Sequence, residues 1–325
     1  MKVFITPSRE VNYRKALEML RKAYRVYATY LISAPLRRKE MLQSEYWRCW
    51  TERLESGIII CDWLVSIEDK HKFNDLLDEF LKALIEKNFE AIREGRVRIR
   101  VLINPFKYPR INLQICDVNG GQKTAIIGFG IESDIIEYGF VIEDQELISM
   151  LLNFFRRLWD RAITIIDRGI NYKGIMEAGT YIGFSETELQ QITEEIREIE
   201  IWHTIQEKLE VHIDIERSEE RLLITAHITN NSIVSLTIEE IRDLIPRGYI
   251  CVVRPEGYTI RDNDLVSDRS AQNRIDPHTS YCVRITVEPR YQPLAEEIEP
   301  KLILSNVRRP ISLGKFRLVN EYEVL

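Results

Sequence analysis

Basic residues gather on and just after one strand-like stretch of the sequence. Arg98 and Arg100 alternate within Val97–Ile103, and Lys107 and Arg110 follow it. Guanidinium groups bind phosphate or carboxylate through paired hydrogen bonds, so these four side chains could form a pocket for a small anion. Basic residues that alternate along a strand are also typical of a solvated strand face, which is the competing interpretation.

Two histidines in the second half of the chain offer metal-binding chemistry. His212 and His227 fall in adjacent predicted strands, on the same polar faces as Asp214 and Thr225, and could meet across a hairpin. Two imidazoles and a carboxylate can bind zinc, but on an exposed sheet such groups usually hold no ion. We therefore predict no metal site, and the sequence indicates no cofactor.

The five cysteines are widely spaced and include no C-x-x-C pair, which argues against a zinc ribbon or a thioredoxin-like motif. They are Cys49, Cys61, Cys116, Cys251 and Cys282. We expect most of them to be core residues. A disulfide between Cys251 and Cys282, which both lie in predicted strands, is the alternative for that pair.

The elements that must position these groups begin with a helical segment. Apolar residues recur at helical spacing over residues 12–53, with a break at residues 33–35, which predicts two helices. Residues 26–32 are also rich in aromatic and β-branched side chains, so a strand is the alternative there.

An α/β pattern follows. Residues 57–67 are apolar at nearly every position, as in a central buried strand, and a helix over residues 69–93 leads to the alternating strand Val97–Ile103. This order predicts a β-α-β unit with a parallel strand pair. Three short strands and an amphipathic helix complete the module, at residues 111–116, 124–129, 138–142 and 144–166.

Residues 57–168 resemble the phospholipase D-like fold, in particular the degenerate lobes that sense effectors in TrmB-type regulators. The resemblance rests on the strand Val97–Ile103 after an amphipathic helix, on the segment around Asp117, on the strand ending at Gly128, and on the closing helix with its Phe-Phe and Leu-Trp pairs. It implies an α/β lobe that pairs with a second lobe.

Active members of that family use an H-x-K-x4-D motif, in which the histidine is the nucleophile. At that spacing this sequence has Arg110, Asn112 and Asp117, and Phe129 stands where a serine usually follows the glycine. Arginine stays protonated near neutral pH and cannot attack phosphorus. The resemblance therefore implies a catalytically dead lobe, in which these residues could still contribute to ligand binding.

The second half of the chain has the period of strands. Residues 169–183 are punctuated by glycine and are expected to be a linker, and Ser185 with Glu188 forms a capping box that opens a helix to about Leu209. Beyond it we expect seven short strands in a β-sandwich, at residues 209–216, 221–229, 234–241, 248–253, 281–287, 301–304 and 315–319.

Part of this region resembles immunoglobulin-like repeats. The resemblance covers residues 209–289 and rests on the run from Leu222 to Thr229, the asparagine turn after it, and the D-x-x-P motif from Asp243 to Pro246. The paired cysteines and core tryptophan of antibody domains are missing, so the resemblance is to the broader sandwich group. It implies a module that presents loops and sheet edges to partners.

Bulk properties agree with two folded modules. The chain has 325 residues, 45% hydrophobic and 30% charged, with a net charge of -6. This charge argues against a nucleic-acid or membrane partner, and the lack of a signal segment predicts a cytoplasmic protein. The abundance of isoleucine, glutamate and arginine suggests a thermophilic source.

The sequence thus predicts an α+β multidomain protein. We expect an N-terminal helical segment (1–56), a degenerate phospholipase D-like module (57–170), a linker and helix (171–208) and an immunoglobulin-like β-sandwich (209–325). The first functional hypothesis is a non-enzymatic ligand-sensing or scaffolding protein, with the sandwich as a possible site for a protein partner. The alternatives are a transcription regulator with an effector-sensing domain, and a phosphodiesterase or nuclease with an unrecognised site.

A symmetric homodimer is also expected. The aromatic residues of the N-terminal helices exceed what one small helical pair can bury internally, and aromatic side chains are enriched at interfaces. They are Tyr24, Tyr27, Tyr46, Trp47 and Trp50. The alternative is that these side chains cover the sheet within one subunit.

Overall fold

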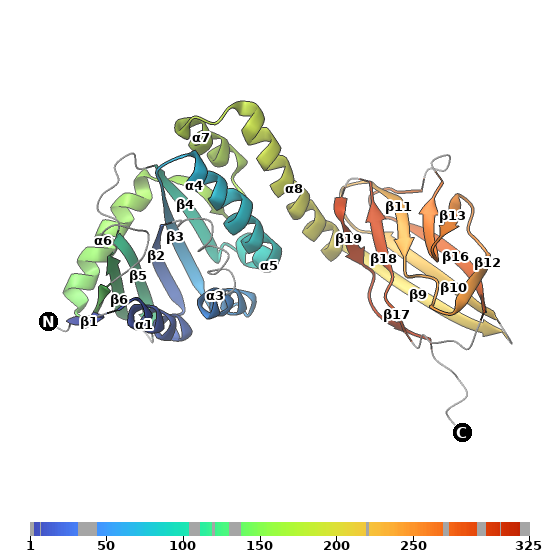
Figure 1. Ribbon diagram of the computed structural model, residues 1–325, viewed down its shortest axis with the longest axis horizontal. Helices are drawn as coiled ribbons and strands as arrows, with labels where there is room; N and C mark the ends of the chain where they lie inside the picture. The colour runs from blue at the N-terminus through green and yellow to red at the C-terminus, as the bar shows by residue number, and fades with distance from the viewer. Residues whose placement is uncertain are drawn as a thin grey trace, which may run out of the picture. The chain divides into compact units, whose positions relative to one another are not determined.

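The computed structural model describes residues 3–6, 8–31, 44–103, 111–118, 121–129, 138–218, 221–268, 273–290, 297–305 and 307–318. The chain divides into two compact units, Met1–Arg197 and Glu198–Leu325. Figure 1 shows the α/β elements of the first unit and the strands of the second.

Unit 1 is built on one eight-stranded mixed sheet. Its strand order is β1-β7-β6-β5-β2-β3-β4-β8. The three adjacent strands β2, β3 and β4 run parallel, and every other neighbouring pair is antiparallel. The strands are β1 (Val3–Thr6), β2 (Arg25–Leu31), β3 (Ile60–Ile67), β4 (Val97–Ile103), β5 (Ile111–Val118), β6 (Gln122–Phe129), β7 (Tyr138–Ile142) and β8 (Ile163–Asp167). The predicted β-α-β unit with parallel strands is confirmed.

Helices cover both faces of this sheet. One face packs against α6 (Gln145–Arg161), whose Phe155 lies edge-on to Tyr27 of β2. On the other face Trp63 of β3 stacks on Trp47 of α3 (Glu45–Glu55). The remaining helical elements of this unit are α1 (Arg9–Lys22), α4 (Lys70–Asp75), the π-helical turn η1 (Leu76–Leu81), α5 (Lys82–Arg93) and α7 (Tyr172–Ile182). Unit 1 is therefore a three-layer α/β structure.

Three predictions for this half are corrected. The two helices expected near the N-terminus are confirmed as α1 and α3, but this segment is not purely helical, because β1 and β2 belong to the sheet and the strand alternative holds for residues 26–31. The helix expected over residues 144–166 ends at Arg161, and β8 follows it. The expected linker contains α7, which Asn171 caps by accepting a hydrogen bond from the Gly174 amide.

Unit 2 is an antiparallel β-sandwich. One sheet has the order β12-β16-β10-β9 and the other β13-β14-β11-β18-β19, with β15 also paired to β11. The strands are β9 (Leu209–Ser218), β10 (Arg221–Asn230), β11 (Leu236–Arg242), β12 (Tyr249–Val253), β13 (Tyr258–Arg261), β14 (Asp264–Ser267), β15 (Arg274–Ile275), β16 (Thr279–Pro289), β17 (Glu297–Ile298), β18 (Lys301–Leu304), β19 (Val307–Ser312) and β20 (Phe316–Arg317).

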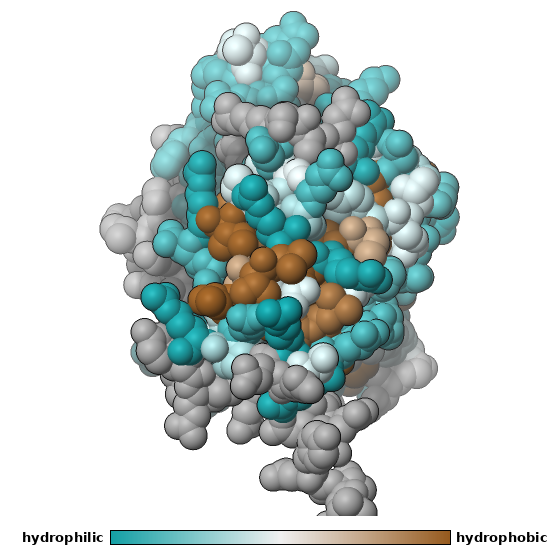
Figure 2. All heavy atoms as spheres, turned by 90° about the vertical axis from the view of Figure 1, so that its right-hand side faces the viewer, coloured by the Kyte–Doolittle hydropathy of each residue, from teal (hydrophilic) through white to brown (hydrophobic). Residues whose placement is uncertain are grey.

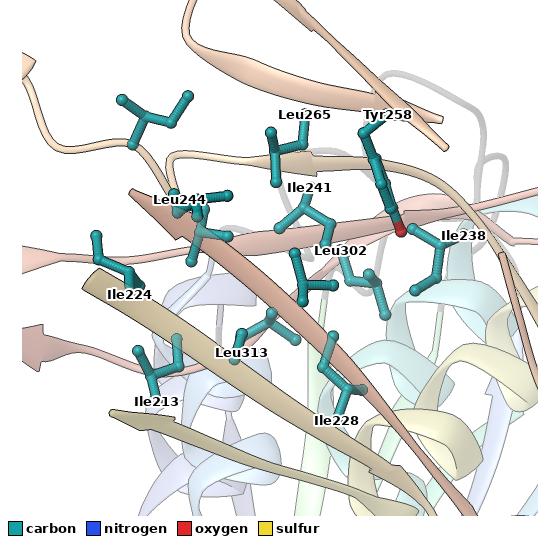
Figure 3. Packing of buried hydrophobic residues seen from close by; sticks show 14 of the residues in the cluster. Ile213, Ile224, Ile228, Ile238, Ile241, Leu244, Tyr258, Leu265, Leu302 and Leu313 are labelled. Carbon is teal, nitrogen blue, oxygen red and sulfur yellow. The ribbon is translucent and has the colours of Figure 1, made fainter. Parts of the chain in front are cut away.

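The two sheets share one hydrophobic core. Figure 3 shows Ile224 and Ile228 of β10 on one side, with Ile241 of β11 and Leu302 of β18 on the other. The helix α8 (Glu186–Lys208) leads into β9, and its Ile205 belongs to the same core cluster. The expected β-sandwich is thus confirmed. The sequence pattern missed five short strands, namely β13, β14, β15, β17 and β19.

Candidate functional sites

A buried carboxylate lies at the amino ends of the parallel strands in unit 1. Asp62 of β3 is only 2% exposed. Arg98 of β4 donates from Nε to Oδ1 (2.5 Å) and from Nη2 to Oδ2 (2.7 Å) of this carboxylate, and Arg25 of β2 donates from Nη2 to Oδ2 (3.0 Å). The guanidinium fork of Arg98 therefore meets both carboxylate oxygens, which is the strongest arrangement for this pair.

This cluster continues across the sheet as a ladder of alternating charge. Lys123 of β6 contacts Asp117 of β5 (Nζ to Oδ2, 3.2 Å), and Asp117 is the cross-strand neighbour of Arg25. On the other side Asp167 of β8 is the cross-strand neighbour of Arg98. Opposite charges on neighbouring strands attract, so the ladder favours this strand register.

Arg100 occupies the next position on the same face of β4. Its Nη1 donates to the Trp159 carbonyl (2.8 Å), and its guanidinium lies 4.9 Å from the centre of the Trp159 ring. The guanidinium of Arg98 lies 5.8 Å from the same ring. Both arginines are therefore held against α6 by cation–π contacts.

The ion pair also affects the acidity of Arg98. Partial burial acts to lower the pKa of this guanidinium, but the hydrogen bonds and the charge of Asp62 outweigh that effect and raise it. Arg98 therefore stays positively charged, and it donates two hydrogen bonds to Asp62. An added anion would have to compete with that carboxylate.

The residues predicted to bind a ligand do not form one cluster. Arg98, Arg100 and Asp117 share the α6 face of the sheet, although two strands separate Asp117 from Arg98. Asn112 lies five residues before Asp117 on the continuous strand β5, so it faces the opposite side. Lys107 and Arg110 lie outside the described residues. Asp62 and Arg25, which complete the cluster, were missed because a pairing between strands is not visible in the sequence.

The histidines of unit 2 do meet across the β9–β10 hairpin. His212 is the cross-strand partner of His227. The Nε2 atom of His212 lies 2.8 Å from Oδ1 of Asp214, and that of His227 lies 3.8 Å from Oδ2. In the part of the chain that the structure describes, no group of three or more His, Cys, Asp or Glu side chains is arranged to hold a metal ion.

The cysteines of unit 2 are not bonded to each other. Cys251 of β12 is opposite Val287 of β16, whereas Cys282 of β16 is opposite His227 of β10. Both thiols are free, so the alternative of a disulfide is wrong. In unit 1, burial raises the pKa of the Cys116 thiol to about 12, which makes this core cysteine a poor nucleophile.

The open edge of the sandwich is the second candidate site. β12 pairs with β16 on one side and has no strand partner on its other side among the described residues. Three of its aliphatic side chains are exposed, namely Ile250 (39%), Val252 (41%) and Val253 (56%). Ile260 of β13, the edge strand of the second sheet, is exposed too.

Figure 2 shows apolar side chains gathered on the face of the molecule on which β12 lies in Figure 1. Native edge strands are usually protected by charged residues, prolines or short length. The five residues of β12 contain neither a charge nor a proline, and the protections that the strand does have are its short length and a register shift between Cys251 and Val253 in its pairing with β16. β12 is therefore an edge strand with which another chain could pair.

The structure itself defines the class of this protein, an α/β unit followed by a β-sandwich. Comparisons with known proteins add little to it. No family model and no curated protein matches the sequence. Among solved structures, the chain is similar to an uncharacterized protein from Nocardia farcinica described as having an immunoglobulin-like fold, with 15% sequence identity. The match covers 35% of this chain and 90% of the other, with a TM-score of 0.25.

At that TM-score the likeness adds nothing to the fold assignment, which rests on the strand pairing described above. None of the comparisons shows a phospholipase D-like module, so that resemblance stays a prediction. Among the described helices, none combines the length and the apolar character needed to cross a membrane.

Proposed function

We propose that this protein is a non-enzymatic scaffolding protein whose β-sandwich binds a partner protein along the open edge strand β12. The observation that carries this proposal is the exposure of Ile250, Val252 and Val253 on an edge strand without charge or proline. Unpaired backbone groups on such a strand accept a further strand, and alternate side chains provide the contact surface.

Unit 1 does not bind the partner protein in this proposal. We propose that it is a degenerate phospholipase D-like lobe, a resemblance that rests on the sequence. The ion pairs among Arg25, Asp62 and Arg98 favour a structural use of these charged side chains. We also propose that unit 1 senses a ligand at Arg98, Arg100 and Asp117. Such a ligand would have to displace the hydrogen bonds that the two arginines already donate to Asp62 and to the Trp159 carbonyl.

A peptide-display selection on the full chain tests partner binding at β12. Random twelve-residue peptides are selected on the wild-type protein and counter-selected on Val252→Lys, which places a charge on the edge strand. We expect enriched peptides with alternating apolar residues, and their affinity for Val252→Lys should fall at least about tenfold because a lysine protects an edge strand.

Val234→Lys is the matched control, since Val234 is 36% exposed, against 41% for Val252, but lies outside the β12 edge. Circular dichroism establishes that both variants are folded. Selection of no peptide on the wild-type chain, or equal binding by wild type and Val252→Lys, would show that β12 is not a binding edge.

A further inference from the structure

Two arginines flank the apolar edge strand. Arg247 lies two residues before β12 and Arg254 follows it directly, and both side chains are exposed. Within the described part of the chain neither of them makes an ion pair, in contrast to Arg221 on β10, which contacts Glu288. The edge therefore has an apolar centre with a positive charge at each end.

The local charge of this edge opposes that of the whole chain. Residues 247–254, which hold β12 and its two flanking arginines, contain no acidic residue and thus carry a net charge of +2. The whole chain carries -6. A charge opposite to that of the rest of the molecule selects partners of complementary charge and suppresses others.

A second copy of this chain does not fit the edge. If two β12 strands paired antiparallel, Arg254 of each would lie near Arg247 of the other, and in a parallel pair each arginine would lie near its own copy. Like charges placed opposite each other on neighbouring strands are destabilising. The arginines therefore act against self-pairing in both orientations.

From this pattern we infer that the partner is an extended peptide with an apolar core and carboxylate side chains at both ends. It adds to β12 as a further strand, its backbone pairs with the free edge, and its aliphatic side chains cover Ile250 and Val252. Its carboxylates reach Arg247 and Arg254. This inference rests on the proposed function, because it names the partner of the same edge.

The spacing of the arginines sets the spacing of the carboxylates. Arg247 and Arg254 are seven residues apart, which corresponds to at most about 23 Å of extended chain. The acidic residues of the partner should therefore flank an apolar segment of about five or six residues. That length is close to the five residues of β12 itself.

Three synthetic peptides test the inference by fluorescence anisotropy on the full chain. Each has blocked ends and a six-residue core of alternating valine and threonine, flanked at both ends by two glutamates, two glutamines or two lysines. We expect the glutamate peptide to bind about fivefold more tightly than the glutamine peptide at low salt, as two exposed ion pairs allow. This advantage should shrink at 0.5 M salt because exposed charges are screened.

Charge reversal provides the decisive variant. In Arg247→Glu/Arg254→Glu the preference should switch to the lysine peptide, whereas Arg217→Glu on β9, at the other edge of the same sheet, should keep the preference for glutamate. Val252→Lys should weaken the binding of all three peptides.

Equal affinity for the glutamate and glutamine peptides, or no switch in the double variant, would overturn the inferred acidic flanks and leave binding at β12 intact. Failure of all three peptides to bind the wild-type chain would overturn both the inference and the proposed function.

Discussion

Asp62 shows how a charged residue can belong to the core of a sheet. The residue is 2% exposed, and its carboxylate is bound by two guanidinium groups whose side chains remain about one-third exposed. Taking a carboxylate out of water is costly, and the paired hydrogen bonds offset that cost. These contacts give Arg98 a structural role between β3 and β4, which the sequence did not indicate.

Replacing Asp62 by asparagine should lower the free energy of unfolding of unit 1 by about 2–3 kcal/mol, because the change leaves two neighbouring guanidinium groups without their counter-ion. Four of the five tryptophans lie in unit 1, so tryptophan fluorescence during urea unfolding measures this effect. Circular dichroism of the variant in buffer establishes that it is folded at the start.

Lys15→Ala is the control for this measurement. Its ion pair with Glu18 lies on the surface of α1, with both side chains almost half exposed, and such pairs contribute less than about 0.5 kcal/mol. If Asp62→Asn cost no more than Lys15→Ala, the buried ion pair would not stabilise the sheet.

At the scale of elements, α7 packs unusually closely on the sheet. A Cβ atom added at Gly174 would lie 2.0 Å from the Thr164 carbonyl oxygen of β8. An alanine in the interior of an exposed helix is normally more favourable than glycine by about 0.5–1 kcal/mol. Here the direction should be reversed, because the helix would have to move away from β8.

Gly174→Ala should therefore destabilise unit 1 by about 1–3 kcal/mol, the usual range for overpacking a well-packed site. Glu177→Ala, at an exposed position of the same helix, should change the stability by less than about 0.5 kcal/mol. Both are measured by urea unfolding. A stabilising effect of Gly174→Ala would mean that α7 is only loosely attached, as expected of the linker predicted from the sequence.

The elements differ in how far the sequence predicted them. Central strands such as β3 and β4 were found because burial on both faces or strict alternation leaves a clear apolar pattern. β8 was missed since its apolar residues directly follow the helix α6 without a turn signal, and they continue the helical pattern. Likewise, the glycines around α7 indicated a linker, although Gly174 serves close packing.

Both candidate sites depend on strand order, which no local pattern contains. Asp62 and Arg98 are neighbours because β3 pairs with β4 in one particular register. β12 is an edge strand because the sheet ends there. The run Tyr249–Val253 is apolar at every position, which is typical of a strand buried on both faces, so the local pattern did not indicate an exposed edge.

At the scale of the whole molecule, each unit has a core of its own. The residues of the sandwich cluster extend from Ile205 to Leu313 and all belong to unit 2. In unit 1, the aromatic side chains that suggested a dimer interface are largely used internally. Trp47 is 2% exposed and Trp50 is 1% exposed. The buried tryptophans therefore no longer argue for a homodimer, which stays a prediction.

Trp47→Glu distinguishes a core role of this tryptophan from an interface role. The Trp47 ring stacks on Trp63 at 6.2 Å and lies 5.1 Å from Phe80, measured between ring centres. A glutamate there would lose these contacts and bury a carboxylate next to the rings of Trp63 and Phe80. Losing a buried tryptophan alone costs about 3–5 kcal/mol, so we expect unit 1 to be unfolded or close to unfolding in buffer.

Fluorescence and light scattering on the same samples check this expectation. Tyr181→Glu is the control, because Tyr181 is 73% exposed and its replacement should shift the stability by less than about 1 kcal/mol. The wild-type mass should be near 38.4 kDa for a single chain or twice that for a dimer. A Trp47→Glu variant that keeps the wild-type unfolding curve and only halves its mass would place Trp47 at a subunit interface, in contradiction to the packing of α3 on β3.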